Sequence, residues 1–303
     1  MSGASNGRKL ELIAQDVMTV EQLLKQNGFS KGLIIELKKT ADGIMIDGKR
    51  VRSTTVMKAE DTLCVTLPNN EVKRAKSGID IPIIYEDEDI IVYNKPSGIA
   101  CHRSGSHIDD TIENTFDGVF RAVTRLDRDT SGLLLVAKHQ LAAGRLWQKT
   151  KKRYIAIAQG KFERIHGKIE LPIMRCRPYD MRRIVDECGD PSLTEYRVIA
   201  QNNSAALVEC ILHTGRTHQA RVHLAAIGHP IIGDTFYGAD DGVMQRQALH
   251  CAKMMFVHPM TEDVMEFTAA PPQDMQNAMK QFGIVLPKEW DDNITIIAKT
   301  DAD

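Results

Sequence analysis

The chain of 303 residues contains no apolar run close to the roughly 20 residues that are needed to cross a bilayer. Its first residues, MSGASNGRK, include no apolar stretch of the kind that secretory signal peptides carry, so we expect no signal peptide. The six cysteines include no C-x-x-C pair. Single, scattered cysteines are typical of a reducing compartment rather than of a disulfide framework, and we therefore expect a cytoplasmic protein.

Internal repeats and low-complexity tracts are also missing from the sequence. The hydrophobic fraction is 43% and the charged fraction is 26%, which is the balance of an ordinary globular protein. This composition excludes a chain that is disordered throughout and a small disulfide-stapled fold. A prior of about 150 residues per domain predicts two domains, or one large domain with an appendage.

The net charge of −1 gives no sign of an anionic partner, but the charge is unevenly distributed. Residues 121–183 contain 16 Lys and Arg against 5 Asp and Glu, a net charge of +11. Such a block is either a solvated basic surface or a surface that faces phosphates. The charge alone leaves both interpretations open.

The first part of the chain predicts a small α+β unit. Thr19 and Gln22 form a capping box before a helical segment, and Ser30 can cap a second helix. The segment IMIDGKRV predicts a hairpin with a type I′ turn at its Asp-Gly pair. The segment CVTL then predicts a closing strand. These patterns give a unit of about fifty residues, near the lower limit for independent stability.

The rest of the chain predicts a larger α+β domain. Strand-like segments such as IIVYN, LLLVAK, YIAIAQG and AALVECIL are mixed with the helix-like segments LAAGRLWQK and THQARVHLAAIG, without regular βαβ alternation. This order favours α+β over a doubly wound sheet. The predicted divisions of the chain are a flexible N-terminus over 1–17, the small α+β unit over 18–67, a polar linker over 68–79, the main domain over 80–286 and an acidic tail over 287–303.

Asp127 is the first candidate for a reactive group. It lies between Arg125 and Arg128, and neighbouring cations favour the charged form of a carboxylate. An ionised and positioned carboxylate can act as a nucleophile, a base or a metal ligand. A surface loop with local ion pairs accounts for the same residues. The D-x-D-x-[TV] loop of aspartate-dependent phosphatases is a third interpretation, but Ser131 stands where that motif needs Thr or Val.

A second candidate segment, residues 212–238, contains four histidines and two arginines around a predicted helix start. Arg216 precedes the helix, where an arginine is well placed to meet an anion. His218 and His223 are five residues apart, a poor spacing for two metal ligands on one helix face, and no H-E-x-x-H motif occurs. We therefore expect structural or RNA-contacting histidines here, and no metal.

Tyr154 is the third candidate. In the segment KKRYIAIAQG it alternates with Ala156 and Ala158 on one face of a predicted strand. A buried core tyrosine and a tyrosine that stacks on a nucleic-acid base both fit this pattern.

Taken together, these segments resemble the RluA family of RNA pseudouridine synthases. DEDIIVYNKPSGIACH matches the first family block, and TRLDRDTSGLLLVAK matches the catalytic block H-R-L-D-x-x-T-S-G. YIAIAQG, TGRTHQARVHLAAIGHPIIGDTFYG and ALHCAKMMFVHPMTEDVMEFTAAPP match later family motifs in the family order. The resemblance spans residues 81–274. The segment 18–67 more loosely resembles an S4 RNA-binding domain.

The resemblance implies a fold, a reaction and a set of site residues. It implies a mixed, mostly antiparallel central sheet, and isomerisation of uridine to pseudouridine in RNA without cofactor or metal. The target base would have to leave its stack. Asp127 would be the catalytic carboxylate, acting on the ribose either as nucleophile or as base. Tyr154 would stack on the uracil, Arg216 would pair with Asp127, and Arg125 would lie at the RNA face in the place of the flipped base.

The resemblance also implies partners. An S4-like unit points to large ribosomal RNA, transfer RNA is the alternative, and a monomer is expected. The +11 block would then contact phosphates. A non-catalytic RNA-binding or assembly protein on the same fold is the alternative function.

One position departs from the family, because Thr124 stands where the family has His before R-L-D. We expect this change to alter substrate contacts while the chemistry is retained.

Overall fold

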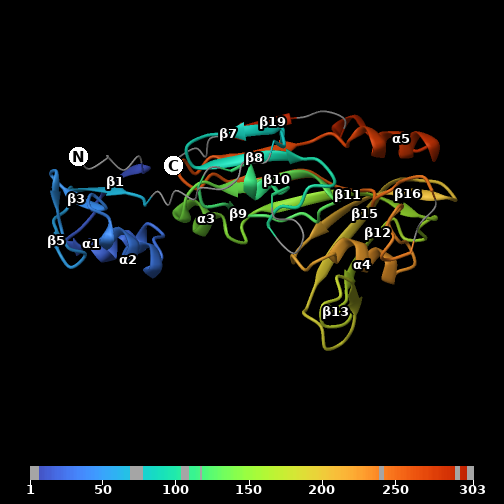
Figure 1. Ribbon diagram of the computed structural model, residues 1–303, viewed down its shortest axis with the longest axis horizontal. Helices are drawn as coiled ribbons and strands as arrows, with labels where there is room; N and C mark the ends of the chain where they lie inside the picture. The colour runs from blue at the N-terminus through green and yellow to red at the C-terminus, as the bar shows by residue number, and fades with distance from the viewer. Residues whose placement is uncertain are drawn as a thin grey trace.

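The computed structural model describes residues 7–68, 78–103, 109–116, 118–238, 242–290 and 294–298. These residues form a small N-terminal unit and a larger body, each with its own hydrophobic cluster. Figure 1 shows the N-terminal unit at one end of the body, next to α3 (Gln140–Leu146). Within the described ranges, no helix has the length and apolar character needed to span a membrane.

The N-terminal unit packs two short helices against a four-stranded sheet with the strand order β1-β6-β3-β4. Its elements, in chain order, are β1 (Lys9–Ile13), β2 (Met18–Thr19), α1 (Val20–Gln26), α2 (Lys31–Lys39), β3 (Ile44–Ile46), β4 (Lys49–Arg50), β5 (Val56–Met57) and β6 (Thr62–Thr66). The predicted capping box at Thr19 and the predicted cap at Ser30 are both present. The β3–β4 turn has left-handed φ values of 48° at Asp47 and 71° at Gly48, which confirms the predicted Asp-Gly turn.

The prediction of a flexible N-terminus over 1–17 is wrong for β1. All five residues of β1 pair antiparallel with β6, and the side chain of Leu10 is buried in the core of the unit. The alternation in KLELI was the signal, but five residues were too few to stand out. Residues 1–6 of the predicted N-terminus and residues 69–77 of the predicted linker lie outside the described residues.

A single large sheet forms the centre of the body, with the strand path β12-β15-β16-β11-β17-β10-β8-β7. β9 pairs with β10, and β18 joins β17 to β19. The elements, in chain order, are β7 (Ile83–Glu86), β8 (Ile90–Lys95), η1 (Ile112–Asn114), β9 (Arg121–Ala122), β10 (Ser131–Ala137), α3, β11 (Lys151–Gln159), β12 (His166–Glu170), β13 (Ile173–Arg175), β14 (Arg183–Val185), β15 (Leu193–Gln201), β16 (Ala205–Leu212), α4 (Gln219–Ala226), β17 (Leu249–Val257), β18 (Val264–Thr268), α5 (Gln273–Gln281), η2 (Lys288–Trp290) and β19 (Ile294–Ala298).

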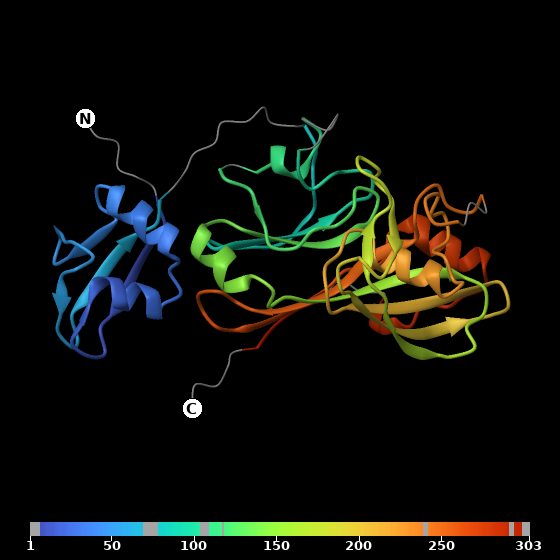
Figure 2. The same cartoon turned by 90° about the horizontal axis from the view of Figure 1, so that it is seen from below.

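The pairing of the described strands is antiparallel except between β10 and β17, which run parallel over Ser131 and Gly132. This confirms the mixed, mostly antiparallel sheet that the resemblance implied. β10 is buried along its whole length, because strands cover both of its edges and side chains pack on both faces. Figures 1 and 2 show α4 and the β13–β14 hairpin on one side of the sheet, where the hairpin extends away from the body.

The end of the chain differs from the predicted acidic tail over 287–303. Within that range, η2 places the Trp290 side chain in the core of the body, where it is 1% exposed. β19 then pairs with β18 and extends the sheet. The apolar, β-branched segment ITIIA provided the signal for this strand. Residues 291–293 and 299–303 lie outside the described residues.

Contacts between the two units involve Arg145 of α3. Its guanidinium donates to the carbonyl of Asn27 at 2.6 Å and to the carbonyl of Pro259 at 2.7 Å. In a second contact, Arg8 of the N-terminal unit donates to the buried carboxylate of Asp89 in the body at 3.1 Å. Leu141 of α3 also belongs to the hydrophobic cluster of the N-terminal unit. The two units therefore share apolar as well as polar contacts.

Candidate active site

The loop that carries Asp127 is fixed through its backbone. Four successive carbonyl groups, from Leu126 to Asp129, each accept a hydrogen bond. The donors are Cys101 Sγ to Leu126 at 3.4 Å, Thr130 N to Asp127 at 3.1 Å, Lys95 Nζ to Arg128 at 2.7 Å and Arg246 Nη1 to Asp129 at 3.0 Å. Burial lowers the pKa of Lys95 to about 8. The loop conformation is thus set by groups from several distant parts of the chain.

The loop leads into β10 through Gly132, which no other residue can replace without strain. Its φ is +109°, and a Cβ placed there would lie 2.3 Å from the carbonyl oxygen of Cys251 on β17. The absence of a side chain therefore lets β10 and β17 approach each other closely. Beside it, the Ser131 hydroxyl lies 2.9 Å from Nδ1 of the buried His250. The T-S-G sequence after Asp127 thus has a packing explanation.

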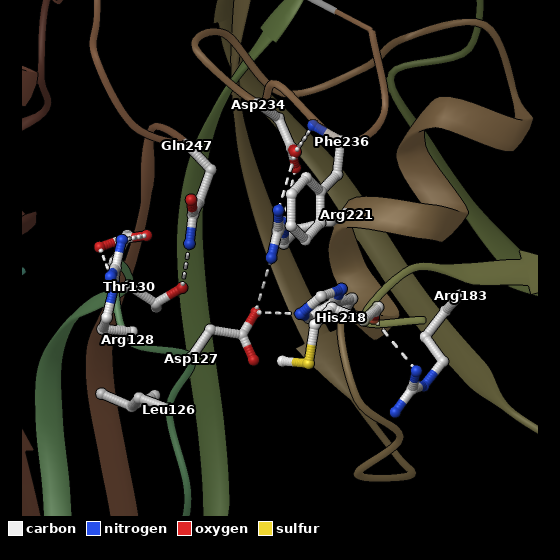
Figure 3. A network of polar contacts seen from close by, with 12 residues as sticks. Leu126, Asp127, Arg128, Thr130, Arg183, His218, Arg221, Asp234, Phe236 and Gln247 are labelled. Carbon is white, nitrogen blue, oxygen red and sulfur yellow. Dashed lines mark hydrogen bonds and ion pairs between the residues drawn. The ribbon is translucent and has the colours of Figure 1, made fainter. Parts of the chain in front are cut away.

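Arg221 on α4 holds the carboxylate of Asp127. Its Nη1 donates to Oδ2 of Asp127 at 3.2 Å, and its other nitrogens donate to both oxygens of Asp234 at 2.6 and 2.8 Å (Figure 3). Burial by itself lowers the pKa of Arg221, but hydrogen bonds and charge from Asp234, together with Asp127, raise it overall. The rings of Phe236 and Tyr237 lie 5.4 and 5.2 Å from the guanidinium. The arginine is therefore a fixed cation in a nearly closed environment.

One carboxylate oxygen of Asp127 is held while the other is left open. Both contacts of the side chain, from Arg221 at 3.2 Å and from His218 at 3.9 Å, reach Oδ2 (Figure 3). In the part of the chain that the structure describes, Oδ1 has no hydrogen-bond partner. The side chain is 26% exposed, so a reactant can reach it. A carboxylate that is oriented at one oxygen and open at the other suits an attack or a proton abstraction at the open oxygen.

Arg216 does not pair with Asp127, contrary to the sequence prediction. Its guanidinium donates to the carbonyl of Pro191 at 3.3 Å and lies 3.5 Å from the exposed carboxylate of Asp190. It precedes α4 and faces solvent, whereas the helix turns Arg221 inward. Of the two arginines in this motif, only the one inside the helix reaches Asp127.

Tyr154 lies in β11 and is 4% exposed. Burial raises its pKa well above 10, and the charges of Cys251 and Asp127 raise it further. The phenol therefore stays neutral near Asp127. The structure thus brings together two of the sequence candidates, Tyr154 on β11 and Asp127 in the loop before β10.

Comparisons with known proteins agree with this site. A family described as RNA pseudouridylate synthase matches residues 89–226, a range that contains Asp127, Tyr154 and Arg221. The uncharacterized RNA pseudouridine synthase YjbO of Bacillus subtilis is 37% identical over 279 residues, which cover 87% of this chain and 99% of that protein. The chain belongs to the RluA family of RNA pseudouridine synthases.

Two further relatives support the assignment of this synthase. The ribosomal large subunit pseudouridine synthase D of Zymomonas mobilis is 38% identical over 236 residues, which cover 68% of this chain and 74% of that protein. A solved structure, human RNA pseudouridylate synthase domain containing 1, has a TM-score of 0.54 and 27% identity, and covers 66% of this chain and 87% of that chain. The protein is an RNA pseudouridine synthase, an isomerase whose substrate is RNA.

Arg125 of the synthase is exposed just before the loop residues that include Asp127. No hydrogen bond or ion pair of its side chain is recorded within the described ranges. An arginine that is free and exposed beside Asp127 is compatible with the predicted place at the RNA face. That role stays a prediction.

Thr124 is buried beside β10, and the hypothesis that it alters substrate contacts stays a prediction. Its side chain is 5% exposed, and its hydroxyl accepts a hydrogen bond from the backbone N–H of Leu135 at 3.0 Å. The residue thus helps to hold the segment before Asp127 against β10. At this position, where the family has His, the Thr124 hydroxyl makes an internal contact of the synthase.

The histidines of the second segment have structural partners. His223 is fully buried, with Nδ1 2.9 Å from the Thr194 hydroxyl and Nε2 2.9 Å from the carbonyl of Leu171. Burial lowers its pKa, which keeps the ring neutral. His229 stacks on Phe162 with ring centroids 3.7 Å apart. The prediction of structural histidines is confirmed for these two.

One group of residues with metal-ligand spacing occurs among the described residues, and it lies away from Asp127. It comprises Asp87, Asp89 and His258. Oδ1 of Asp87 accepts the backbone N–H groups of Asp89 and Ile90 at 2.7 and 2.8 Å. Its Oδ2 lies 2.9 Å from both the Tyr85 hydroxyl and Nε2 of His258. Because protein donors already occupy both oxygens of Asp87, this group is a hydrogen-bonded junction rather than a metal site.

Two residues of the site were missed from the sequence. Arg221 and Asp234 form the ion pair that supports Asp127, and neither was assigned a role. The available signal was the isolated aspartate in the apolar segment HPIIGD, because a carboxylate that follows an apolar run needs a buried partner. Thirteen positions separate the two residues, so only the fold could identify the partner.

Proposed function

We propose that this synthase modifies uridines of large-subunit ribosomal RNA, with Asp127 as the group that reacts with the target nucleotide. The observation that carries the role of Asp127 is its geometry: Oδ2 is held by the buried Arg221, while Oδ1 is open. In the overall reaction, the N1–C1′ bond of uridine breaks, C5 bonds to C1′, the hydrogen of C5 passes to water as a proton, and N1 takes up a proton. Asp127 takes part in the step at the ribose, as nucleophile or as base.

The choice of ribosomal RNA rests on two observations. The relative from Zymomonas mobilis is named for the large ribosomal subunit. The N-terminal unit offers a second basic surface, a cleft of about 680 Å³ lined by residues that include Lys38, Arg50 and Arg52. We propose that this unit is an S4-like RNA-binding domain whose cleft contacts phosphates of the same RNA.

We also propose that the synthase works as a monomer in the cytoplasm. All six cysteines are free thiols, which is the state expected in a reducing compartment. Size-exclusion chromatography with light scattering checks the monomer, and fractionation of cells that express a tagged protein checks the compartment. A dimer mass, or recovery outside the cytoplasmic fraction, would contradict these two points.

Tritium release tests the proposed reaction directly. RNA labelled at uridine C5 is prepared from cells that lack the protein, separated into large-subunit ribosomal RNA and transfer RNA, and treated with enzyme in the presence of a chelator. Wild type is expected to release tritium from the ribosomal fraction, while Asp127→Asn releases none and still binds RNA. Release by Asp127→Asn would remove Asp127 from the chemistry, and release from transfer RNA alone would overturn the substrate assignment.

The same assay has an arm for the N-terminal cleft. A Lys38→Gln/Arg50→Gln/Arg52→Gln variant removes three cations that lie far from Asp127. We expect a raised KM and weaker RNA binding, an unchanged kcat, and a smaller salt dependence of the affinity. Unchanged affinity and salt dependence would show that the cleft does not contact the RNA.

A further inference from the structure

His218 lies beside Asp127, and no role has been assigned to it so far. It is the residue before α4, its side chain is buried, and its Nε2 lies 3.9 Å from Oδ2 of Asp127. Its backbone is left-handed, with φ 58°, and its side chain makes no hydrogen bond to the helix that it precedes. A left-handed conformation at a residue other than glycine costs free energy and is often found at functional sites. This backbone conformation directs the imidazole at Asp127 (Figure 3).

A hydrogen-bond chain determines which nitrogen of His218 carries the proton. Nδ1 of His218 lies 2.8 Å from the hydroxyl oxygen of Tyr237, and that oxygen also accepts the backbone N–H of Arg183 at 2.9 Å. The Tyr237 hydroxyl has one hydrogen, which it can donate to Nδ1. The proton of a neutral His218 then lies on Nε2 and points at the carboxylate. The other tautomer would turn an Nε2 lone pair toward an anion, which is unfavourable.

Burial favours the neutral form of His218. Burial lowers the pKa of His218 most; Asp127 raises it, Arg221 and Arg183 lower it, and Asp234 raises it. The outcome is a pKa below 6.5, so the ring is neutral at neutral pH. Asp127 is therefore faced by one cation, Arg221, and by one neutral N–H group. The carboxylate keeps more of its reactivity than it would between two cations.

We propose that His218, held in one tautomer by Tyr237, is a positioning residue for Asp127. When the target nucleotide is in place, the Nε2–H group closes from 3.9 Å to hydrogen-bonding distance and donates to Oδ2. Arg221 and His218 then fix Oδ2 from two directions, and Oδ1 faces the ribose. His218 gives up no proton in this step. The proposal rests on the role of Asp127 proposed above.

Four variants test this proposal with the tritium-release assay. His218→Phe removes the donor and keeps an aromatic ring, and His218→Gln puts an amide N–H close to the position of Nε2. Tyr237→Phe leaves His218 in place without its partner, and His213→Gln is the matched control on an exposed histidine paired with Glu195. We expect His218→Phe to lower kcat about 10- to 100-fold with little change in KM. His218→Gln should recover most of this loss, Tyr237→Phe should fall between them, and the control should match wild type.

A pH profile and NMR give readouts that a purely structural role would not change. Protonation of His218 places a second cation against Asp127, so kcat of wild type should fall below the pKa of His218. His218→Gln should lack this decrease. In wild type at neutral pH, the ¹⁵N signals of the ring should report the neutral Nε2–H tautomer, and Tyr237→Phe should report a mixture of tautomers.

The outcomes that overturn the proposal are distinct from failure of the proposed function. An Nδ1–H or doubly protonated His218 at neutral pH would overturn it, and so would wild-type kcat in His218→Phe. Equal loss in His218→Gln and His218→Phe, together with a lower melting temperature, would mean that the ring is needed only for packing. The role of Asp127 is judged separately. Whether Asp127→Asn releases tritium in the same assay does not depend on the results for the His218 variants.

Discussion

The N-terminal unit and the active centre are held together over very different distances along the chain. In the N-terminal unit, Thr19 bonds to Gln22 and Ser30 bonds to Leu33, so each cap joins residues three positions apart. At the active centre, Arg221 reaches Asp127 across 94 positions and Arg246 reaches Asp129 across 117. The helix starts of the first region are fixed by local signals, whereas the second region is fixed by groups that only the complete fold brings together.

The largest expected effect comes from breaking the long-range network at Arg221. Arg221→Met keeps the length of the side chain but leaves the carboxylate of Asp234 buried without its partner. We expect loss of tritium release and a decrease of about 3–5 kcal/mol in the free energy of unfolding, measured with urea. A double variant with Asp234→Asn should be more stable than Arg221→Met alone, and equal stability would show that the pair does not support the fold.

A second effect on the body depends on pH. Burial lowers the pKa of His250 to about 4, whereas an unfolded histidine titrates near 6.5. The folded protein holds this ring neutral. The contribution of the neutral ring to the free energy of unfolding is therefore complete above pH 6.5 and is lost as the pH falls toward 4. The loss amounts to at most about 3 kcal/mol. Urea unfolding of wild type and His250→Asn at several pH values should show the smaller pH dependence in the variant; parallel curves would contradict the shift.

A smaller effect is expected from a local signal of the N-terminal unit. Thr19→Ala removes the hydroxyl that accepts the backbone N–H of Gln22. We expect a decrease of about 1 kcal/mol in the free energy of unfolding and unchanged kcat. Thr19→Ser keeps the hydroxyl and is the control. A change in kcat would show that the two regions are more strongly coupled than the contacts of Arg145 and Arg8 suggest.

The smallest effect on stability is expected at Arg216, the arginine that we had expected to pair with Asp127. Its ion pair with Asp190 is exposed, and such pairs contribute about 0–1 kcal/mol. Arg216→Gln should therefore leave the melting temperature and kcat nearly unchanged, and raise KM a few-fold if the guanidinium contacts RNA, with Arg216→Lys as the charge-preserving control. A loss of kcat comparable to that of Arg221→Met would restore Arg216 to the catalytic centre.

The sequence predicted those features whose causes lie within a few residues. The caps at Thr19 and Ser30, the Asp-Gly turn and the apolar strands are all of this kind. The β13–β14 hairpin was missed because its strands are three residues long and lie among turn-forming residues. Helix α5 and the strand β19 were missed because the matched family motifs end at residue 274, in the first turn of α5.

The site could be predicted only in part for the same reason. Motif order pointed to Asp127 and Tyr154 as candidates. The partner of Asp127 had to be chosen from two arginines five positions apart, and that choice depends on the direction in which α4 leaves the turn at His218. The left-handed conformation of His218 sets this direction. The side chain of His218 is in turn bonded to Tyr237, 19 positions further along the chain, a contact that a linear pattern does not contain.

The carbonyl contacts of the Asp127 loop have a consequence for how the enzyme can change over generations. Because the conformation of residues 126–129 is held through backbone oxygens, it depends little on which side chains the loop carries. Arg125 and Arg128 project outward beside Asp127, so they can mutate without disturbing the carboxylate. Descendants of one ancestral synthase could in this way acquire new RNA targets by exchanging a few outward-facing residues, while the reacting group and its supports stayed as they were.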